Sequence, residues 1–252
     1  MLPIHRASVL LGLALAARLD AQAAPISDNS FLLEEAYNQE AGVVQHVATV
    51  MGDDGMDVME LGFTQEWPIF SQRHQVSYTL PLLRVGDETR WGDVEIQYRY
   101  QLLSGRVAVA PSLTAILPTG HDAFGAGNAG FQAGVPVSVA LSPAFVAHTN
   151  AGVTLLPNIG DQDGAEGEVE VSLGQSVVWL AHPRLNLLVE ALWSRSEAGE
   201  SVSESLLVSP GVRAAFNLGS TQVVPGLAVP IGVGASSRER YAFLYLSVEH
   251  PF

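Results

Sequence analysis

Polar and apolar residues alternate along most of this chain. In residues 93–101 (DVEIQYRYQ), charged and amide side chains occupy every second position, and apolar side chains occupy the positions between them. The same alternation returns in residues 74–80, 168–177 and 185–194. A period of two places successive side chains on opposite faces of a strand. No stretch has a convincing helical period, so the sequence predicts an all-β protein.

Twelve segments of this kind can be placed along the chain, each long enough to cross a bilayer as a tilted strand. They are expected near residues 41–51, 56–67, 74–84, 93–103, 106–118, 130–142, 145–156, 168–181, 184–195, 204–216, 220–232 and 241–252. Short turns alternate with longer acidic or glycine-rich loops, as in outer-membrane barrels with short periplasmic turns. We therefore predict a membrane-spanning, antiparallel, up-and-down β-barrel of about 12 strands with both termini in the periplasm. Prolines remove ladder donors, so bulges or frayed strands are expected at some of Pro81, Pro111, Pro136, Pro210, Pro225 and Pro230.

The two ends of the chain carry export signals. His5 and Arg6 precede an apolar run, and Ala21-Gln22-Ala23 forms a small-x-small cleavage site, so residues 1–23 are predicted to be a signal peptide. Residues 24–252 then form a single barrel domain. The last strand resembles the sorting signal that the outer-membrane assembly machinery reads, with an assembly signal formed by Leu246, Val248 and Phe252. His250 and Pro251 depart from that pattern, and an ordinary edge strand that stops at Phe252 is the alternative.

Composition narrows the class of protein. The formal net charge is -14, every basic residue other than histidine is arginine, and 48% of the residues are hydrophobic. A strongly acidic chain argues against nucleic acid as a partner. There is no cysteine, so no disulfide stabilises the fold. No stretch approaches the roughly 18 consecutive apolar residues of a membrane helix.

Several blocks of sequence resemble a known family. They are FLLEEAYNQEAGVVQH, QEWPI followed by SQRHQVSY, GDVEIQYRYQL and AVAPSLTAILPTG. Together they resemble the outer-membrane β-barrels of the transporter or meta-pathway phenol-degradation family, from about Phe31 to the carboxy terminus. The resemblance implies an outer-membrane barrel that takes up aromatic or other small hydrophobic compounds. It implies no residue-level mechanism.

The predicted lumen carries the candidate functional side chains. They are Glu66, Glu95, Arg99, His148, Glu190 and Arg213. These residues form either a network that satisfies charges in a narrow hydrated lumen or a selectivity element. A net acidic lumen would favour cations or neutral solutes over anions.

No catalytic residue, cofactor or metal site is predicted. Lipid-cleaving barrels carry a serine two residues after a histidine, and no mature histidine here has one. The chain lacks paired-histidine spacing and a phosphate loop. The acidic loop around residues 161–168 lacks the ligand spacing of a calcium loop and is expected to be a solvated outer loop.

Two functions remain open from sequence, and the protein is not expected to be an enzyme. The first is a channel or transporter for small solutes, including aromatic or hydrophobic ones. The second is a non-conducting structural or surface-interaction barrel, and a lipid-modifying enzyme is disfavoured. The expected partners are the lipid bilayer with lipopolysaccharide, the outer-membrane assembly machinery and a small-molecule solute.

Overall fold

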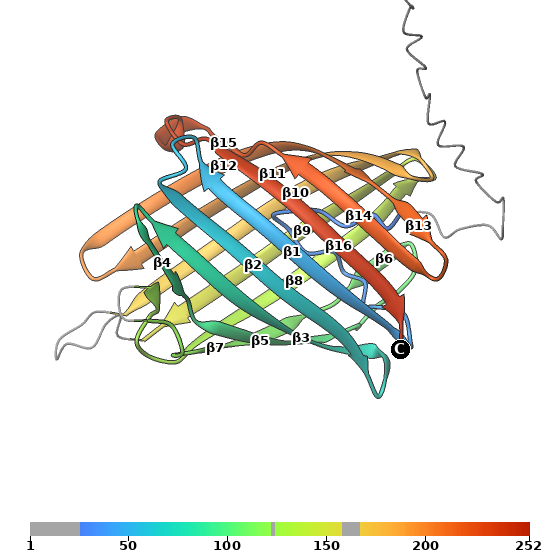
Figure 1. The fold of residues 1–252 in the computed structure, drawn as a ribbon, viewed down its shortest axis with the longest axis horizontal. Helices are drawn as coiled ribbons and strands as arrows, with labels where there is room; N and C mark the ends of the chain where they lie inside the picture. The colour runs from blue at the N-terminus through green and yellow to red at the C-terminus, as the bar shows by residue number, and fades with distance from the viewer. Residues whose placement is uncertain (1–25, 122–123, 158–166) are drawn as a thin grey trace, which may run out of the picture.

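The chain forms one closed antiparallel sheet, shown in the computed structural model of Figure 1. The structure describes residues 26–121, 124–157 and 167–252. The predicted signal peptide and residues 161–166 of the acidic loop lie outside the described residues. None of the helices in the described part of the chain is long and apolar enough to span a membrane.

The strands follow one another around the wall in chain order. They are β1 (Val43–Asp53), β2 (Val58–Ile69), β3 (Ser71–Val85), β4 (Glu88–Trp91), β5 (Val94–Tyr100), β6 (Val107–Val109), β7 (Ser112–Leu117), β8 (Gly130–Ser142), β9 (Phe145–Leu156), β10 (Glu168–His182), β11 (Leu185–Ala198), β12 (Ser201–Ala214), β13 (Phe216–Leu218), β14 (Thr221–Ala228), β15 (Ile231–Gly232) and β16 (Tyr241–Pro251). A short 3-10 helix, η2 (Gly234–Ser236), precedes β16.

Four of the wall strands are interrupted. The pairs β4 and β5, β6 and β7, β12 and β13, and β14 and β15 each run along the same neighbour and form one wall strand, which leaves twelve. The first and last strands close the barrel, because β1 pairs with β16 from Val43↔Pro251 to Asp53↔Tyr241. The predicted up-and-down barrel of twelve strands is confirmed.

The barrel is polar inside and apolar outside. His148, Glu190 and Ser209 face inward and are fully buried, whereas the outward side chains of Leu173 and Val189 are each 53% exposed. Alternation along each strand produces this division. An apolar exterior around a polar interior is the arrangement that suits a barrel surrounded by lipid.

Two details of the predicted strands are wrong. The expected loops at residues 85–92 and 196–203 are largely strand, since only residues 86–87 separate β3 from β4 and only residues 199–200 separate β11 from β12. Gly86 and Gly199 adopt positive φ in these tight turns. Long hairpins therefore replace two of the expected loops.

Some of the strand prolines interrupt their strands, as predicted, and the others do not. Pro81, Pro136, Pro210 and Pro225 keep a continuous register. Pro111 and Pro230 do interrupt their strands. Register shifts instead fall beside short turns, at Pro68/Ile69, Ala140/Ser142 and Trp179/His182.

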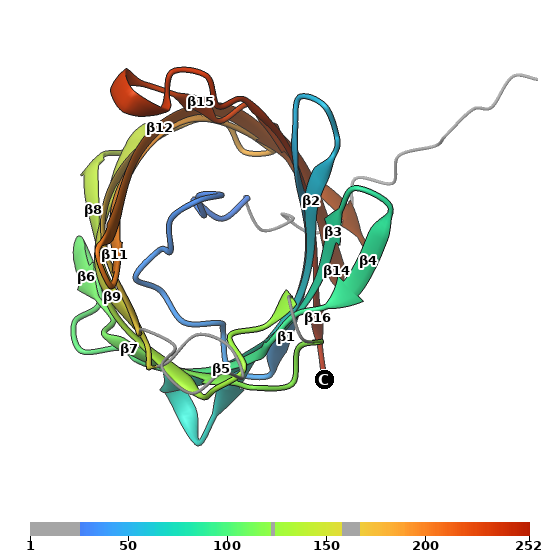
Figure 2. The same ribbon diagram turned by 90° about the vertical axis from the view of Figure 1, so that its left-hand side faces the viewer.

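Residues 26–42, here called the lumen segment, lie inside the barrel. Figure 2 shows this segment, in dark blue, within the ring of strands. It precedes β1 and contains no strand or helix. The sequence analysis did not predict this segment. Its position determines how much of the lumen remains open to solutes.

Candidate functional site

The lumen segment enters and leaves the barrel at the end where the chain terminates. The backbone N–H of Ile26 donates to the carbonyl of Pro183 in the β10–β11 turn, at 3.0 Å. The side chain of Asn38 donates to the carbonyl of Gln72, near the β2–β3 turn, also at 3.0 Å. Both turns lie at the same end of the barrel as Phe252. The segment therefore turns back within the lumen, between its two ends.

One carboxylate holds the turning point of the lumen segment. Glu190 on β11 accepts hydrogen bonds at Oε1 from three consecutive backbone N–H groups, those of Phe31, Leu32 and Leu33, at 3.1, 2.9 and 3.2 Å. Consecutive N–H groups that converge in this way form a nest for an anion. Glu190 is fully buried. A predicted lumen residue thus fixes the lumen segment to the wall.

Arginine and asparagine side chains of the wall fix the first part of the segment. Arg213 on β12 donates to the carbonyls of Asn29 at 2.7 Å and Ser27 at 3.3 Å. Its guanidinium lies 4.9 Å from the ring centroid of Tyr245 on β16, a cation–π contact. Asn186 on β11 also donates to the carbonyl of Ser27, at 2.8 Å. These contacts satisfy backbone carbonyls of a segment that has no secondary structure of its own.

A serine–histidine pair bridges two points of the lumen segment. The N–H of Ala36 donates to Ser138 Oγ at 2.8 Å, and Ser138 Oγ lies 2.7 Å from His148 Nδ1. His148 Nε2 lies 2.9 Å from the carbonyl oxygen of Asp28. These bonds require Ser138 to donate to His148 and His148 to donate to Asp28. Both wall side chains are fully buried, so the pair is an attachment point rather than an accessible nucleophile.

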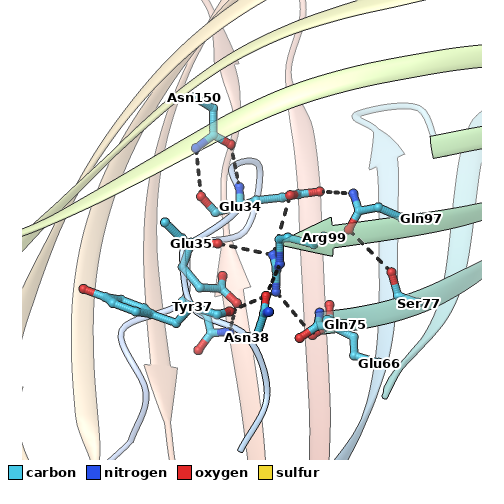
Figure 3. A network of polar contacts seen from close by, with 12 residues as sticks. Glu34, Glu35, Tyr37, Asn38, Glu66, Gln75, Ser77, Gln97, Arg99 and Asn150 are labelled. Carbon is cyan, nitrogen blue, oxygen red and sulfur yellow. Dashed lines mark hydrogen bonds and ion pairs between the residues drawn. The ribbon is translucent and has the colours of Figure 1, made fainter. Parts of the chain in front are cut away.

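Arg99 on β5 forms the centre of a polar network around the second half of the segment (Figure 3). Its guanidinium donates to the carbonyls of Glu35 at 3.2 Å and Tyr37 at 2.9 Å, and to Asn38 Oδ1 at 3.1 Å. Two carboxylates are close to it, Glu34 at 3.6 Å and Glu66 at 3.9 Å. Arg99 is only 2% exposed, so its charge depends on these partners.

Amide side chains of the wall supply the remaining attachments. The N–H of Glu34 donates to Asn150 at 2.8 Å, that of Asn38 to Gln101 at 3.0 Å, and that of Gln39 to Gln75 at 2.8 Å. Asn150 and Gln101 also return hydrogen bonds to backbone carbonyls, those of Glu34 and Ala36. An amide offers both a donor and an acceptor, so each pairs with the backbone much as a neighbouring strand would.

Glycines in the wall make room for apolar side chains of the segment. A Cβ atom built at Gly211 or at Gly226 would lie 2.6 Å from the ring of Phe31, and one at Gly174 would overlap Leu33. The ring of Phe31 also packs against Phe243 and Tyr245, with centroids 5.4 and 5.3 Å away. The inner surface of the barrel is therefore shaped for this segment.

A cavity of about 240 Å³ remains between the lumen segment and the wall. Four carboxylates line it against the single guanidinium of Arg99, and they are Glu34, Glu35, Glu66 and Glu95. Glu35 lies on the segment, and burial raises the pKa of its carboxyl while nearby Arg99 lowers it. The raised pKa shows that burial outweighs the guanidinium. The remaining lumen space is thus polar and predominantly acidic.

The six predicted lumen residues all face inward, but their surroundings differ from the expected hydrated network. Arg99, His148, Glu190 and Arg213 bond directly to the lumen segment. Glu66 accepts a hydrogen bond from Gln75 at 2.9 Å and lies beside Arg99. Glu95 lines the cavity. The predicted assembly residues Leu246 and Val248 lie on the outward face of β16, and Phe252 directly follows this strand. Leu246 and Phe252 are 43% and 66% exposed.

Sequence reasoning missed the wall amides and the glycines that receive Phe31 and Leu33. The glycines lie at inward positions of strands, where a small residue has no packing role in an empty lumen. That pattern, together with the apolar run Phe31–Leu33 ahead of the first strand, was the available signal. The inward glycines can be explained only if a segment of the chain is assumed to lie inside the barrel against them.

Solved structures of similar shape are outer-membrane proteins. An outer membrane channel from Pseudomonas putida F1 matches with a TM-score of 0.61 and 13% identity, covering 86% of this chain and 98% of that one. The NanC porin matches with a TM-score of 0.60 and 7% identity, covering 82% and 100%. The KdgM porin, solved with disordered oligogalacturonate, matches with a TM-score of 0.52 and 7% identity, covering 83% and 99%. At these identities the likeness shows a shared fold.

No curated protein matches the sequence. A family model does match, and it covers residues 27–246, which includes the lumen segment from its second residue and nearly all of the barrel. The resemblance seen in the sequence blocks is confirmed by this match. The chain therefore belongs to the family described as "Putative MetA-pathway of phenol degradation".

Proposed function

We propose that the protein is an outer-membrane channel for small solutes, and that the lumen segment controls passage through it. The proposal rests on how the lumen is filled. Side-chain hydrogen bonds and three apolar contacts with glycines hold the lumen segment in place, and a polar cavity lies beside it. Such attachments can be exchanged for water when the segment moves, whereas a packed apolar core cannot. The similar solved structures, which are named as a channel and porins, support it.

The location follows from the surface of the barrel. Its exterior is apolar, so it suits a lipid bilayer, with lipopolysaccharide as the outer neighbour. In the proposed orientation both termini lie in the periplasm, and the lumen segment closes the periplasmic half. Leu246, Val248 and Phe252 are proposed to form the signal read by the assembly machinery.

The solute is proposed to be small, and cationic or neutral. Glu34, Glu66 and Glu95 surround the cavity, and Arg99 offsets only part of their charge. A net negative constriction attracts cations and repels anions. The family description supports aromatic compounds as candidates, and the rings of Phe31 and Tyr245 at the cavity could contact an aromatic solute.

The filled lumen also favours a second candidate, a non-conducting barrel with a structural or surface-interaction role. In that case the lumen segment would be a permanent part of the core. Glu190, Arg213 and His148 would then serve stability alone. The two candidates differ in whether the segment leaves its site under any membrane potential.

Planar-bilayer recording of the purified full-length mature chain distinguishes them. For a channel, we expect discrete conductance steps. In a potassium chloride gradient, the reversal potential should have the sign of a cation-selective pore. Glu95→Gln should reduce that selectivity and Arg99→Gln should increase it, since each changes the charge of the cavity lining by one unit. Absence of conductance at all potentials, with no solute entry into liposomes, would support the non-conducting barrel.

A further inference from the structure

Two histidines meet on the outer surface of the barrel, at the seam where its first and last strands pair. His46 lies on β1 and His250 on β16, two antiparallel strands that lie side by side in Figure 1. Their Nε2 atoms are 3.0 Å apart. The ring centroids are 5.1 Å apart and the ring planes differ by 23°. The two rings therefore meet at their Nε2 atoms, and their ring planes are nearly parallel.

The pair faces outward and lies near the end of the barrel. Gln45 and Glu249, the neighbours of the two histidines in sequence, bond to each other inside the lumen at 2.9 Å, so the histidines occupy the opposite face. The pairing of β1 with β16 begins only a few residues away, at Val43↔Pro251. Close by, Trp67 packs on Phe252 with ring centroids 5.2 Å apart. Aromatic residues of this kind mark the membrane–water interface, where ions from the aqueous phase can reach the imidazoles.

The outer nitrogen of each ring is also bonded. His250 Nδ1 lies 2.9 Å from the carbonyl oxygen of Pro251, so Nδ1 carries the proton and Nε2 presents its lone pair. His46 Nδ1 lies 2.7 Å from the side-chain amide of Gln65, which in turn accepts a hydrogen bond from the hydroxyl of Tyr78. A metal-ligating histidine commonly donates its second N–H to a carbonyl, as His250 does here. His46 instead accepts from the NH₂ group of Gln65 at that nitrogen.

We propose that His46 and His250 form a binding site for Zn²⁺ or a chemically similar first-row divalent ion. Two imidazole nitrogens around a tetrahedral Zn²⁺ ion are separated by about 3.3 Å, close to the separation observed here. Imidazole is a ligand for zinc, copper and nickel, whereas calcium and magnesium prefer oxygen. Water completes the coordination shell.

Binding requires a turn of both rings, so that the two Nε2 lone pairs converge on the ion. It also requires one rearrangement of protons, which the neighbours of the pair accommodate. His46 must move its proton from Nε2 to Nδ1, which leaves the ring neutral and releases no proton. Gln65 then turns its amide so that Oε1 accepts from His46 Nδ1, and its NH₂ group donates to the oxygen of Tyr78. A tyrosine hydroxyl can donate or accept, so no member of the chain loses its partner.

The site joins residues that are 204 positions apart in sequence. An ion held by both side chains links β1 directly to β16 and stabilises closure of the barrel by mass action. The described residues contain no group of three or more histidine, cysteine or carboxylate side chains suited to a metal ion. The proposed site therefore has two protein ligands. It lies outside the lumen and is independent of the proposed transport.

The test measures Zn²⁺ binding to the full-length mature protein folded in detergent. Isothermal titration compares wild type with His46→Gln, His250→Gln and the control His74→Gln. His74 is matched because it also faces outward near the same end but bonds to Tyr98, at 2.7 Å, rather than to a second histidine. We expect one Zn²⁺ site in wild type and in the control, weakened at least about tenfold in each of the other variants. Ca²⁺ should not bind.

A second readout separates binding from folding. Heat-modifiable gel mobility confirms that each variant forms a barrel, and Zn²⁺ should raise the temperature of the mobility change in wild type and His74→Gln only. If His46→Gln fails to fold, His250→Gln alone decides. Equal Zn²⁺ affinity in all folded proteins, or no binding at millimolar Zn²⁺, would overturn the proposal.

Discussion

The Oε1 atom of Glu190 lies 2.9 Å from the backbone nitrogen of Leu32, and the same oxygen accepts from the residues on either side of Leu32. A side chain of the wall therefore holds the lumen segment at its turning point through the segment's backbone N–H groups rather than through the segment's side chains. The other carboxylate oxygen of Glu190 is buried without a hydrogen-bond partner among the described residues. The position of the segment thus depends strongly on one carboxylate.

Replacing Glu190 with alanine should release the segment. Three buried N–H groups would lose their shared acceptor, at a cost on the order of 3 kcal/mol. A cost of that size changes the ratio of closed to open channels by roughly a hundredfold. Single-channel recording should show a much larger open fraction. Glu95→Gln is the control, because Glu95 lines the same lumen without gripping the segment, and an unchanged open fraction in Glu190→Ala would contradict the role given to this contact.

Filling the space under Phe31 should have a similar effect by steric means. A Cβ atom at Gly226 would lie 2.6 Å from the Phe31 ring, so Gly226→Ala should displace the ring and raise the open fraction. Combining it with Phe31→Ala removes the clash. The double variant should therefore be less open than the sum of the two single effects predicts. Strict additivity in a double-mutant cycle would show that the two residues do not touch in the closed state.

The channel should open more readily as the pH rises. Burial raises the pKa of Glu35 above its ordinary value of 4.5 when the segment is in place. The closed state therefore binds this proton more tightly than the released state. The stabilisation is complete below the ordinary pKa and is lost as the pH rises through the raised pKa. The side chain of Asn29 donates to Glu35 Oε1 at 2.7 Å, and a glutamine at position 35 can still accept this hydrogen bond. Glu35→Gln should therefore flatten the dependence of open fraction on pH, and an identical profile in wild type and variant would contradict the assignment.

Deletion of Phe252 tests the proposed assembly signal. The residue is 66% exposed, and apart from its contact with Trp67 and the hydrogen bond from its N–H to the carbonyl of Gly42 it contributes little to the wall. The deletion should reduce outer-membrane insertion in cells while leaving refolding in detergent nearly unchanged. Fractionation and heat-modifiable mobility measure the two effects separately. A parallel loss of both would show that Phe252 acts through stability.

The inward or outward facing of strand residues could be predicted from the sequence, and the six lumen candidates lie on the inner wall. The alternation of DVEIQYRYQ shows why, because each inward polar residue is separated by an apolar neighbour. The role of those residues was not readable. Glu190 and Arg213 act on residues more than 150 positions earlier in the chain, through backbone groups that any sequence possesses. The sequence predicted that the first and last strands pair, but it did not give their register. It therefore did not show that His46 and His250 lie side by side.

Reversible locking of the lumen segment tests the central claim most directly. The chain contains no cysteine, so a Leu33→Cys, Gly174→Cys double variant would carry a single pair, placed where the Leu33 side chain lies against Gly174. The two single variants serve as controls. Oxidation of the double variant should abolish conductance in planar bilayers, and reduction of the same channels should restore it, while the controls should not respond. Equal conductance before and after reduction, with the disulfide shown to have formed, would contradict control of the channel by the lumen segment.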